Sequence, residues 1–138
     1  MCAEFFLKKY LLEEHKKIKA SSAGIQANPE GIHPIVKEEL NKRGIDYSKH
    51  VQRKVTKEIL DSSNLVVSMT TFHKDFLKEK FNHDSILFNE LCFGKNEDFL
   101  DFPDILQETN SKEKAEEYIR IAIKEIENGC KKLSKQLV

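Results

Sequence analysis

The chain has 138 residues, and its 23 Lys and Arg side chains are matched by 23 Asp and Glu side chains, so the formal net charge is zero. This length fits one domain spanning residues 1–138, and the zero net charge argues against nucleic acid or an anionic membrane surface as a partner. No apolar run approaches the roughly 18 residues that a membrane span needs, and no secretory signal opens the chain, so we expect a cytoplasmic protein.

The first predicted element is a helix over residues 1–10 with a broad apolar face. Apolar side chains fill most of its first seven positions, and Tyr10, Leu11 and Leu12 continue the run. A helix of this composition must be buried on a wide face. No usable N-cap residue precedes it, so the free N–H groups of its first turn would face an adjacent core. We therefore expect another element to stand before this helix.

One strand and two helices are predicted before residue 61. Residues 18–22 form a short strand candidate that ends in small polar residues. Residues 34–40 form a helix that opens with a proline and stops at Gly44. Residues 56–60 form a short helix that the threonine at its start can cap.

The next predicted elements alternate between strand and helix. Residues 64–69 are the clearest strand, since their apolar run is typical of a strand buried on both faces. Residues 71–81 fit a helix, and residues 85–88 fit a second short strand. Residues 93–110 read as a loop with glycine, proline and acidic residues.

The last predicted element is the longest helix, which Asn110 or Ser111 can cap. Apolar side chains recur along it at steps of three or four, as in an amphipathic helix. The predicted packing positions are Ala115, Tyr118, Ile119, Ala122, Ile126, Cys130 and Leu133.

Strands that alternate with helices indicate an α/β fold with a parallel sheet and helices on both faces. Only three strands are visible in the sequence. The opening helix should follow a strand, as in a βα unit, so we expect one strand to be missing.

The three cysteines, Cys2, Cys92 and Cys130, are scattered and show no C-x-x-C spacing. Neither a disulfide framework nor a zinc site is supported by this pattern, so we expect no metal and no cofactor. Buried or idle thiols are the simplest interpretation.

Five short motifs follow one another at compatible spacing and together span nearly the whole chain. They are Ala3-Glu4-Phe5-Phe6, Ser22-Ala23-Gly24, the segment from His50 to Glu58, Val66 to Thr70 with His73, and Leu100-Asp101-Phe102. In these motifs the chain resembles the low-molecular-weight protein tyrosine phosphatases and their bacterial protein-arginine phosphatase relatives. The resemblance implies a three-layer α/β sandwich with a parallel four-stranded sheet. It also implies hydrolysis of phosphotyrosine or phosphoarginine through a phosphocysteine intermediate.

One departure from the family is severe, because the chain contains no C-x5-R-S nucleophile loop. Arg43, Arg53 and Arg120 are its arginines, and none lies six residues after a cysteine. In an alignment on Ala3-Glu4, the Arg-Ser pair would end just before residue 1. We therefore expect an N-terminally truncated chain that lacks the first strand and the nucleophile, and that is inactive as written.

The resemblance implies roles for four residues of this chain. Asp101 is the predicted general acid, with Asp104 as the alternative, because both fall near the family's acidic loop motif. Ser22 and His50 match positions that support the nucleophile loop by hydrogen bonds. Without the family, the two acids read as solvated loop residues, Ser22 as a strand-end hydroxyl and His50 as an ordinary packed side chain. Cys2 is a poor substitute nucleophile, since no arginine follows it to hold a phosphate.

Two other functions stay open at this point. The chain could be a catalytically inactive phosphatase-like binding or regulatory protein. A thioredoxin-coupled arsenate reductase ranks last, because it needs further cysteines near the third strand and residues 66–73 contain none. The expected partner is a phosphorylated protein, with phosphate or another oxyanion bound if the loop is present. Unpaired sheet edges would favour oligomerisation or domain swapping.

Overall fold

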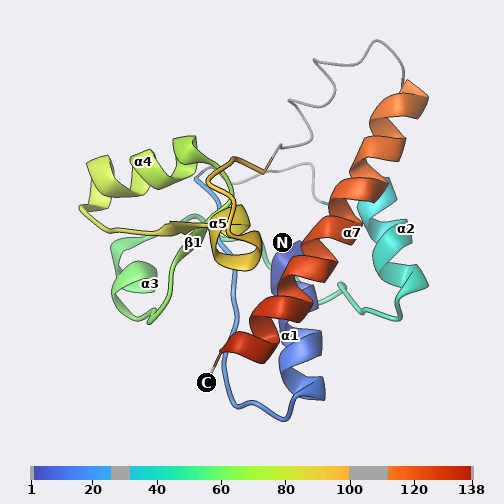
Figure 1. The fold of residues 1–138 in the computed structure, drawn as a ribbon, viewed down its shortest axis with the longest axis horizontal. Coiled ribbons are helices and arrows are strands. Elements are labelled where there is room, and N and C mark those ends of the chain that lie inside the picture. Colours follow the sequence, from blue (N-terminus) through green and yellow to red (C-terminus); the bar gives the residue numbers. More distant parts are fainter. Residues whose placement is uncertain (1, 26–31, 100–111, 138) are drawn as a thin grey trace.

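The structure is a computed structural model, and it describes residues 2–25, 32–99 and 112–137. The described elements, in chain order, are α1 (Cys2–Glu13), α2 (Pro34–Lys42), α3 (Lys57–Asp61), β1 (Val67–Ser68), α4 (Thr71–Phe81), β2 (Ile86–Leu87), α5 (Phe88–Phe93) and α7 (Lys112–Gln136). Figure 1 shows α1, α2 and α7 gathered on one side of the molecule and the strands with α3 and α4 on the other, while α5 lies between them.

The core lies where α1 packs along α7 and where α2 and α5 close over them. Phe6 and Tyr10 of α1 belong to this core, and Leu11 is also buried; all three are at most 9% exposed. The predicted apolar face of the opening helix is therefore confirmed in part, because Leu12, which belonged to the predicted run, is 77% exposed. None of the helices in the described part of the chain is long and apolar enough to cross a membrane.

Helix α7 confirms the long final helix but corrects its packing face. Tyr118, which we expected to pack, is 53% exposed, whereas Ile123, which we did not expect, is buried. Each helical residue turns by about 100°, so Tyr118 lies beside the buried stripe rather than on it. The stripe is made of Ala115, Ile119, Ile123, Cys130 and Leu133. The predicted caps, Asn110 and Ser111, lie outside the described residues.

A network of charged groups joins α1, α2 and α7. Arg43 donates through Nη1 to Glu39 at 2.7 Å and through Nε to Glu127 at 3.1 Å. Arg120 of α7 also pairs with Glu39, and the Tyr10 hydroxyl donates to Glu127 at 3.1 Å. Burial, followed by this hydrogen bond to Glu127, raises the pKa of Tyr10 to about 12. Glu39, which is buried, and Glu127, which is partly buried, therefore each have at least two donors.

Two threonines from the motifs are helix caps. Thr56 accepts a hydrogen bond from the Ile59 N–H, and Thr70 accepts one from the His73 N–H, each at 3.2 Å. A side-chain acceptor at this position satisfies an N–H group that the first turn leaves free. The predicted helices at 56–60 and 71–81 are confirmed as α3 and α4. Asn82 ends α4 in the left-handed region, at φ 51°.

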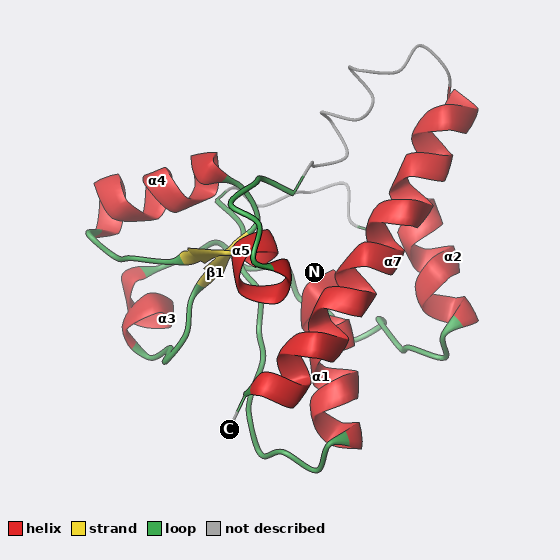
Figure 2. Ribbon diagram, in the orientation of Figure 1, coloured by secondary structure: helices red, strands yellow, loops and turns green. Residues whose placement is uncertain are grey.

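The strands are shorter and fewer than predicted. Within the described residues, β1 and β2 form a two-stranded parallel sheet, with Val67 beside Ile86 and Ser68 beside Leu87. Three of the four strands of the expected sheet were predicted in this chain, and the described residues form two of them; Figure 2 shows how little of the ribbon is strand. The predicted strands at 64–69 and 85–88 keep only these two-residue cores.

The predicted strand at 18–22 is not formed in the structure. Its residues alternate between half-buried and exposed, as in a strand with one covered face, and an isolated parallel bridge joins Gly24 to Lys54. A strand requires a continuous ladder to a neighbouring strand, and no described segment runs alongside residues 18–22 in that way. The local pattern predicted the extended conformation, but it could not supply the partner.

Helix α5 was missed by the sequence analysis, which placed a strand end and a loop there. Phe88 and Cys92, four positions apart, are both buried, and Gly94 ends the helix at φ 68°. The i, i+4 spacing and the glycine are the signals that could have found it. The Phe88 and Phe93 rings of α5 pack against Gly129 of α7. A Cβ atom added at Gly129 would come within 2.7 Å of the Phe88 ring.

Candidate active site

Glu4, in the first turn of α1, joins the two residues predicted to support a nucleophile loop. Its side chain is 8% exposed. Oε1 accepts a hydrogen bond from the Ser22 N–H at 2.9 Å, and Oε2 lies 3.3 Å from His50 Nδ1. One carboxylate therefore binds two segments, separated in sequence by 28 residues, to the beginning of a helix. Such a buried acid is stable only because both oxygens have donors.

His50 is held from two sides. Its ring packs edge-on against Phe5, with ring centroids 5.3 Å apart, while Nδ1 faces Glu4. A carboxylate only accepts hydrogen bonds, so Nδ1 must carry the hydrogen of this contact. The backbone N–H of His50 also donates a hydrogen bond to the Tyr47 carbonyl at 3.1 Å. The ring orientation is therefore fixed, and Nε2 remains the nitrogen for further contacts.

Ser22 is placed by its backbone. Its N–H donates to Glu4, and its carbonyl accepts a hydrogen bond from Arg53 Nη2 at 3.2 Å. Two residues further on, the Gly24 N–H donates to the Arg53 carbonyl, and the Val55 N–H donates to the Gly24 carbonyl, each at 2.8 Å. Residues 22–24 are thus attached to residues 53–55 on one side and to α1 on the other.

Asp101 and Asp104 lie outside the described residues, so their positions are not given by the structure. The described chain leading to them is anchored at the carboxyl end of β1. The Phe99 N–H donates to the Met69 carbonyl at 2.8 Å. Asp98 accepts hydrogen bonds from the N–H and the hydroxyl of Thr71 at 2.7 and 2.6 Å.

The three thiols lack the environment of a nucleophile. Burial raises the pKa of Cys2, and it raises the pKa of Cys92 to about 11 and that of Cys130 to about 12. A nucleophilic cysteine needs the opposite shift, because the thiolate is the reactive form. Cys130 instead donates to the Ala3 carbonyl at 3.4 Å. The described residues also contain no group of three or more His, Cys, Asp or Glu side chains that could hold a metal ion.

Glu4 and Arg53 are the site residues that sequence reasoning missed. Both fall inside motifs that carry the resemblance, but neither had been given a role. The available signal was Glu4 itself, an ionisable side chain among apolar residues in the first turn of a helix that had to be buried. Charged side chains at such positions are paired.

Comparison with known proteins supports the resemblance. The whole chain, residues 1–138, matches the family described as "Low molecular weight phosphotyrosine protein phosphatase". None of the curated proteins matches the chain in sequence.

Solved structures of this family share its fold. A YwlE arginine phosphatase with a phosphorylated active-site serine is 27% identical, with a TM-score of 0.79 over 99% of this chain and 86% of its own. The low-molecular-weight protein tyrosine phosphatase from T. tengcongensis is 25% identical, with a TM-score of 0.80 over 99% and 89%. That from Bacillus subtilis, solved in solution, is 26% identical, with a TM-score of 0.75 over 99% and 87%. The chain thus has an α/β fold and belongs to the low-molecular-weight phosphotyrosine protein phosphatase family.

Proposed function

We propose that this chain carries the supporting part of a phosphomonoester hydrolase site that acts on phosphotyrosine or phosphoarginine through a phosphocysteine intermediate. The observation that carries the proposal is the Glu4 bridge. It gathers Ser22 and His50 at the first turn of α1, where free N–H groups and the helix dipole favour an anion. These are the residues that the family resemblance assigns to loop support.

The proposal requires a nucleophilic cysteine with an arginine six residues later, a pair that this sequence does not contain. The thiolate attacks phosphorus and forms the phosphocysteine, and the arginine holds two phosphate oxygens as the tyrosine oxygen or the arginine nitrogen departs. None of the three cysteines of the chain is followed six residues later by arginine. Hydrolysis therefore needs a C-x5-R-S loop beyond the residues of this sequence, seated against Ser22 and His50.

Asp101 is proposed as the general acid, with Asp104 as the alternative. A carboxylic acid in this role protonates the leaving group, the phenolic oxygen of phosphotyrosine or the guanidine nitrogen of phosphoarginine, and then activates the water that hydrolyses the phosphocysteine. The support is the anchoring of Asp98 and Phe99 at the end of β1, immediately before this segment in the sequence.

The test is a chimera in which a strand and a C-x5-R-S loop from a family phosphatase precede residue 1. We expect the chimera to hydrolyse p-nitrophenyl phosphate, and we expect Asp101→Asn to lower kcat by roughly a hundredfold. Asp75→Asn, an exposed position on α4, is the matched control and should change nothing. A folded chimera without turnover would contradict the proposal. A loss in Asp104→Asn, but not in Asp101→Asn, would reassign the acid.

A catalytically inactive binding or regulatory protein is the second candidate. The observation that favours it is that burial raises the pKa of every one of the three thiols, of which Cys92 and Cys130 are buried and Cys2 is partly buried, and none has an arginine at the required spacing. It predicts that the chain as given folds and shows no turnover of p-nitrophenyl phosphate, yet binds a phosphorylated protein. Turnover that a thiol alkylator abolishes would exclude it.

A further inference from the structure

A groove of about 700 Å³ runs along α1 on the side that faces away from the core. Residues 43–53 form its other wall. Glu4 and His50 lie at one end of it, and Lys8, Lys9 and Leu12 extend it along the helix. Its size is that of a site for a small molecule or a short chain segment.

Cations outnumber carboxylates in this groove. Lys8, Lys9, Lys49 and Arg53 line it, together with Arg43, which is paired with Glu39 and Glu127 as described above. The groove contains two carboxylates, and both already have donors. Glu4 contacts Ser22 and His50 and pairs with Lys8, whose Nζ lies 3.7 Å from Oε1, and Asp46 accepts a hydrogen bond from the Ser48 N–H at 2.9 Å. The remaining surface is therefore positive, although the whole chain has no net charge.

The same groove presents the two most exposed large apolar side chains of the described residues. Leu12 is 77% exposed and Val51 is 71% exposed, and they come from the two opposite walls. An exposed apolar side chain alone needs no explanation. Two such side chains in one groove, bordered by cations, are typical of a surface that binds a partner.

We propose that this groove binds an acidic segment of a partner protein, with large apolar side chains that cover Leu12 and Val51. The segment's carboxylates would pair with Lys9, Lys49 and Arg53. A continuous polyanion such as nucleic acid fits less well, because Glu4 and Asp46 lie in the groove and Leu12 and Val51 would stay uncovered. This binding needs no hydrolysis, so its test is independent of turnover, although the groove shares Glu4, His50 and Arg53 with the candidate active site.

The test measures fluorescence anisotropy of a labelled peptide in which Glu and Leu residues alternate, at low and at physiological salt. We expect saturable binding that weakens with added salt. The double variant Lys9→Glu with Lys49→Glu should weaken binding by at least roughly tenfold, since it turns two attractions into repulsions. Lys124→Glu, on an exposed position of α7, is the matched control.

The apolar contribution is tested by Leu12→Ser with Val51→Ser, which should weaken binding by roughly fivefold while circular dichroism stays unchanged. A peptide with Ser in place of Leu should show the same loss. Four results would overturn the proposal: no binding of the peptide, an equal loss in Lys124→Glu, tighter binding of a single-stranded oligonucleotide of the same charge, or self-association of the chain that Leu12→Ser abolishes. The last result would make a second copy the occupant.

Discussion

The charged network between α1, α2 and α7 and the extended segment at residues 18–24 hold their polar groups by different means. In the network, several donors converge on Glu39 and Glu127, and the apolar core lies directly beneath. The extended segment is strand-like in its burial pattern, but its described attachments are the hydrogen bonds of Ser22 and Gly24 to Glu4 and to residues 53–55. The stability of the molecule therefore resides in the helices, whereas the candidate site depends on a few side chains.

The largest expected effect tests the first half of this comparison. Phe6 is fully buried between α1 and α7. Phe6→Ala should lower the free energy of unfolding by about 3–5 kcal/mol, because it removes an aromatic ring and leaves a cavity. Urea denaturation followed by circular dichroism measures this change. The control is Phe72→Ala, at a 70% exposed position, which should stay within about 0.5 kcal/mol of the original chain. Equal losses of unfolding free energy in both variants would contradict the claim that the packed helices provide the stability.

The next effect concerns the charged network. Burial raises the pKa of Glu39, but hydrogen bonds from Arg43, Arg120 and Lys42 outweigh it and lower the pKa to about 2. Glu39→Gln should therefore cost about 2–3 kcal/mol, less than for a fully buried pair because Arg120 is 36% exposed.

The lowered pKa of Glu39 also predicts how the free energy of unfolding depends on pH. The side chain of a glutamate in an unfolded chain has a pKa of about 4.3. The stabilisation by Glu39 is thus complete above that pH and declines as the pH falls toward 2. Denaturation at a series of pH values should show this decline in the original chain and a smaller one in Glu39→Gln. Parallel pH profiles would show that Glu39 does not act through its charge.

A smaller effect is expected where α5 meets α7, between the two halves of the molecule. A Cβ at Gly129 would lie 2.7 Å from the Phe88 ring and 3.2 Å from the Phe93 ring. Gly129→Ala should cost about 1–3 kcal/mol through overpacking, although alanine favours the helix itself. Adding Phe88→Leu should recover part of the loss, and a double-mutant cycle measures this coupling. If the losses of the two single variants simply add in the double variant, the strain does not arise from the contact between residue 129 and the Phe88 ring.

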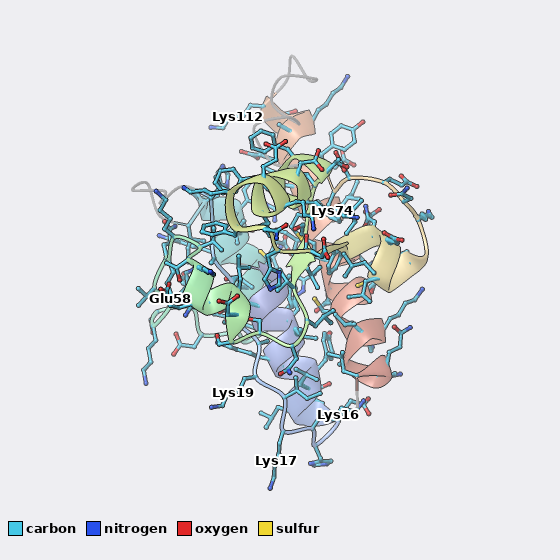
Figure 3. All side chains as sticks on the ribbon, turned by 90° about the vertical axis from the view of Figure 1, so that its left-hand side faces the viewer. Lys16, Lys17, Lys19, Glu58, Lys74 and Lys112 are labelled. Carbon is cyan, nitrogen blue, oxygen red and sulfur yellow. The ribbon has the colours of Figure 1, made fainter. Side chains whose placement is uncertain are left out.

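The smallest effect concerns the end of α7. Lys16 Nζ donates to the carbonyls of Ser134 and Lys135 at 2.6 and 3.1 Å, so it caps the last turn. Lys16→Met should cost about 0.5–1.5 kcal/mol. Lys17→Met is the matched control. Figure 3 shows both lysines at the same end of the molecule, with Lys17 pointing outward. Thermal denaturation separates the two variants, and equal melting temperatures would contradict the cap.

Most of the helices were predictable because their signals are local, although α5 was missed. Apolar spacing, Pro34, Thr56 and Thr70 identify α1, α2, α3 and α4 from neighbouring residues alone. Strands depend on distant partners. The run at 64–69 was correct as a strand, but the pairing that limits it to Val67–Ser68 is not encoded nearby.

The candidate site was predictable only in part, for the same reason. The motifs suggested Ser22 and His50 as candidates, but nothing in them indicates that one carboxylate joins the two residues. That contact depends on how residues 22 and 50 approach the first turn of α1. Glu4 could have been suspected as a buried acid, but its partners come from the tertiary structure.

The most direct test of the account is amide hydrogen exchange, measured residue by residue by NMR, in the original chain and in Glu4→Ala. We predict that the amides of Ser22 and Gly24 exchange slowly while those of Lys19 and Ala20 exchange fast. Glu4→Ala should release Ser22 and leave the amides of α7 protected. Uniform protection across residues 18–22, or a Ser22 amide that Glu4→Ala does not affect, would contradict the claim that this single carboxylate assembles the site.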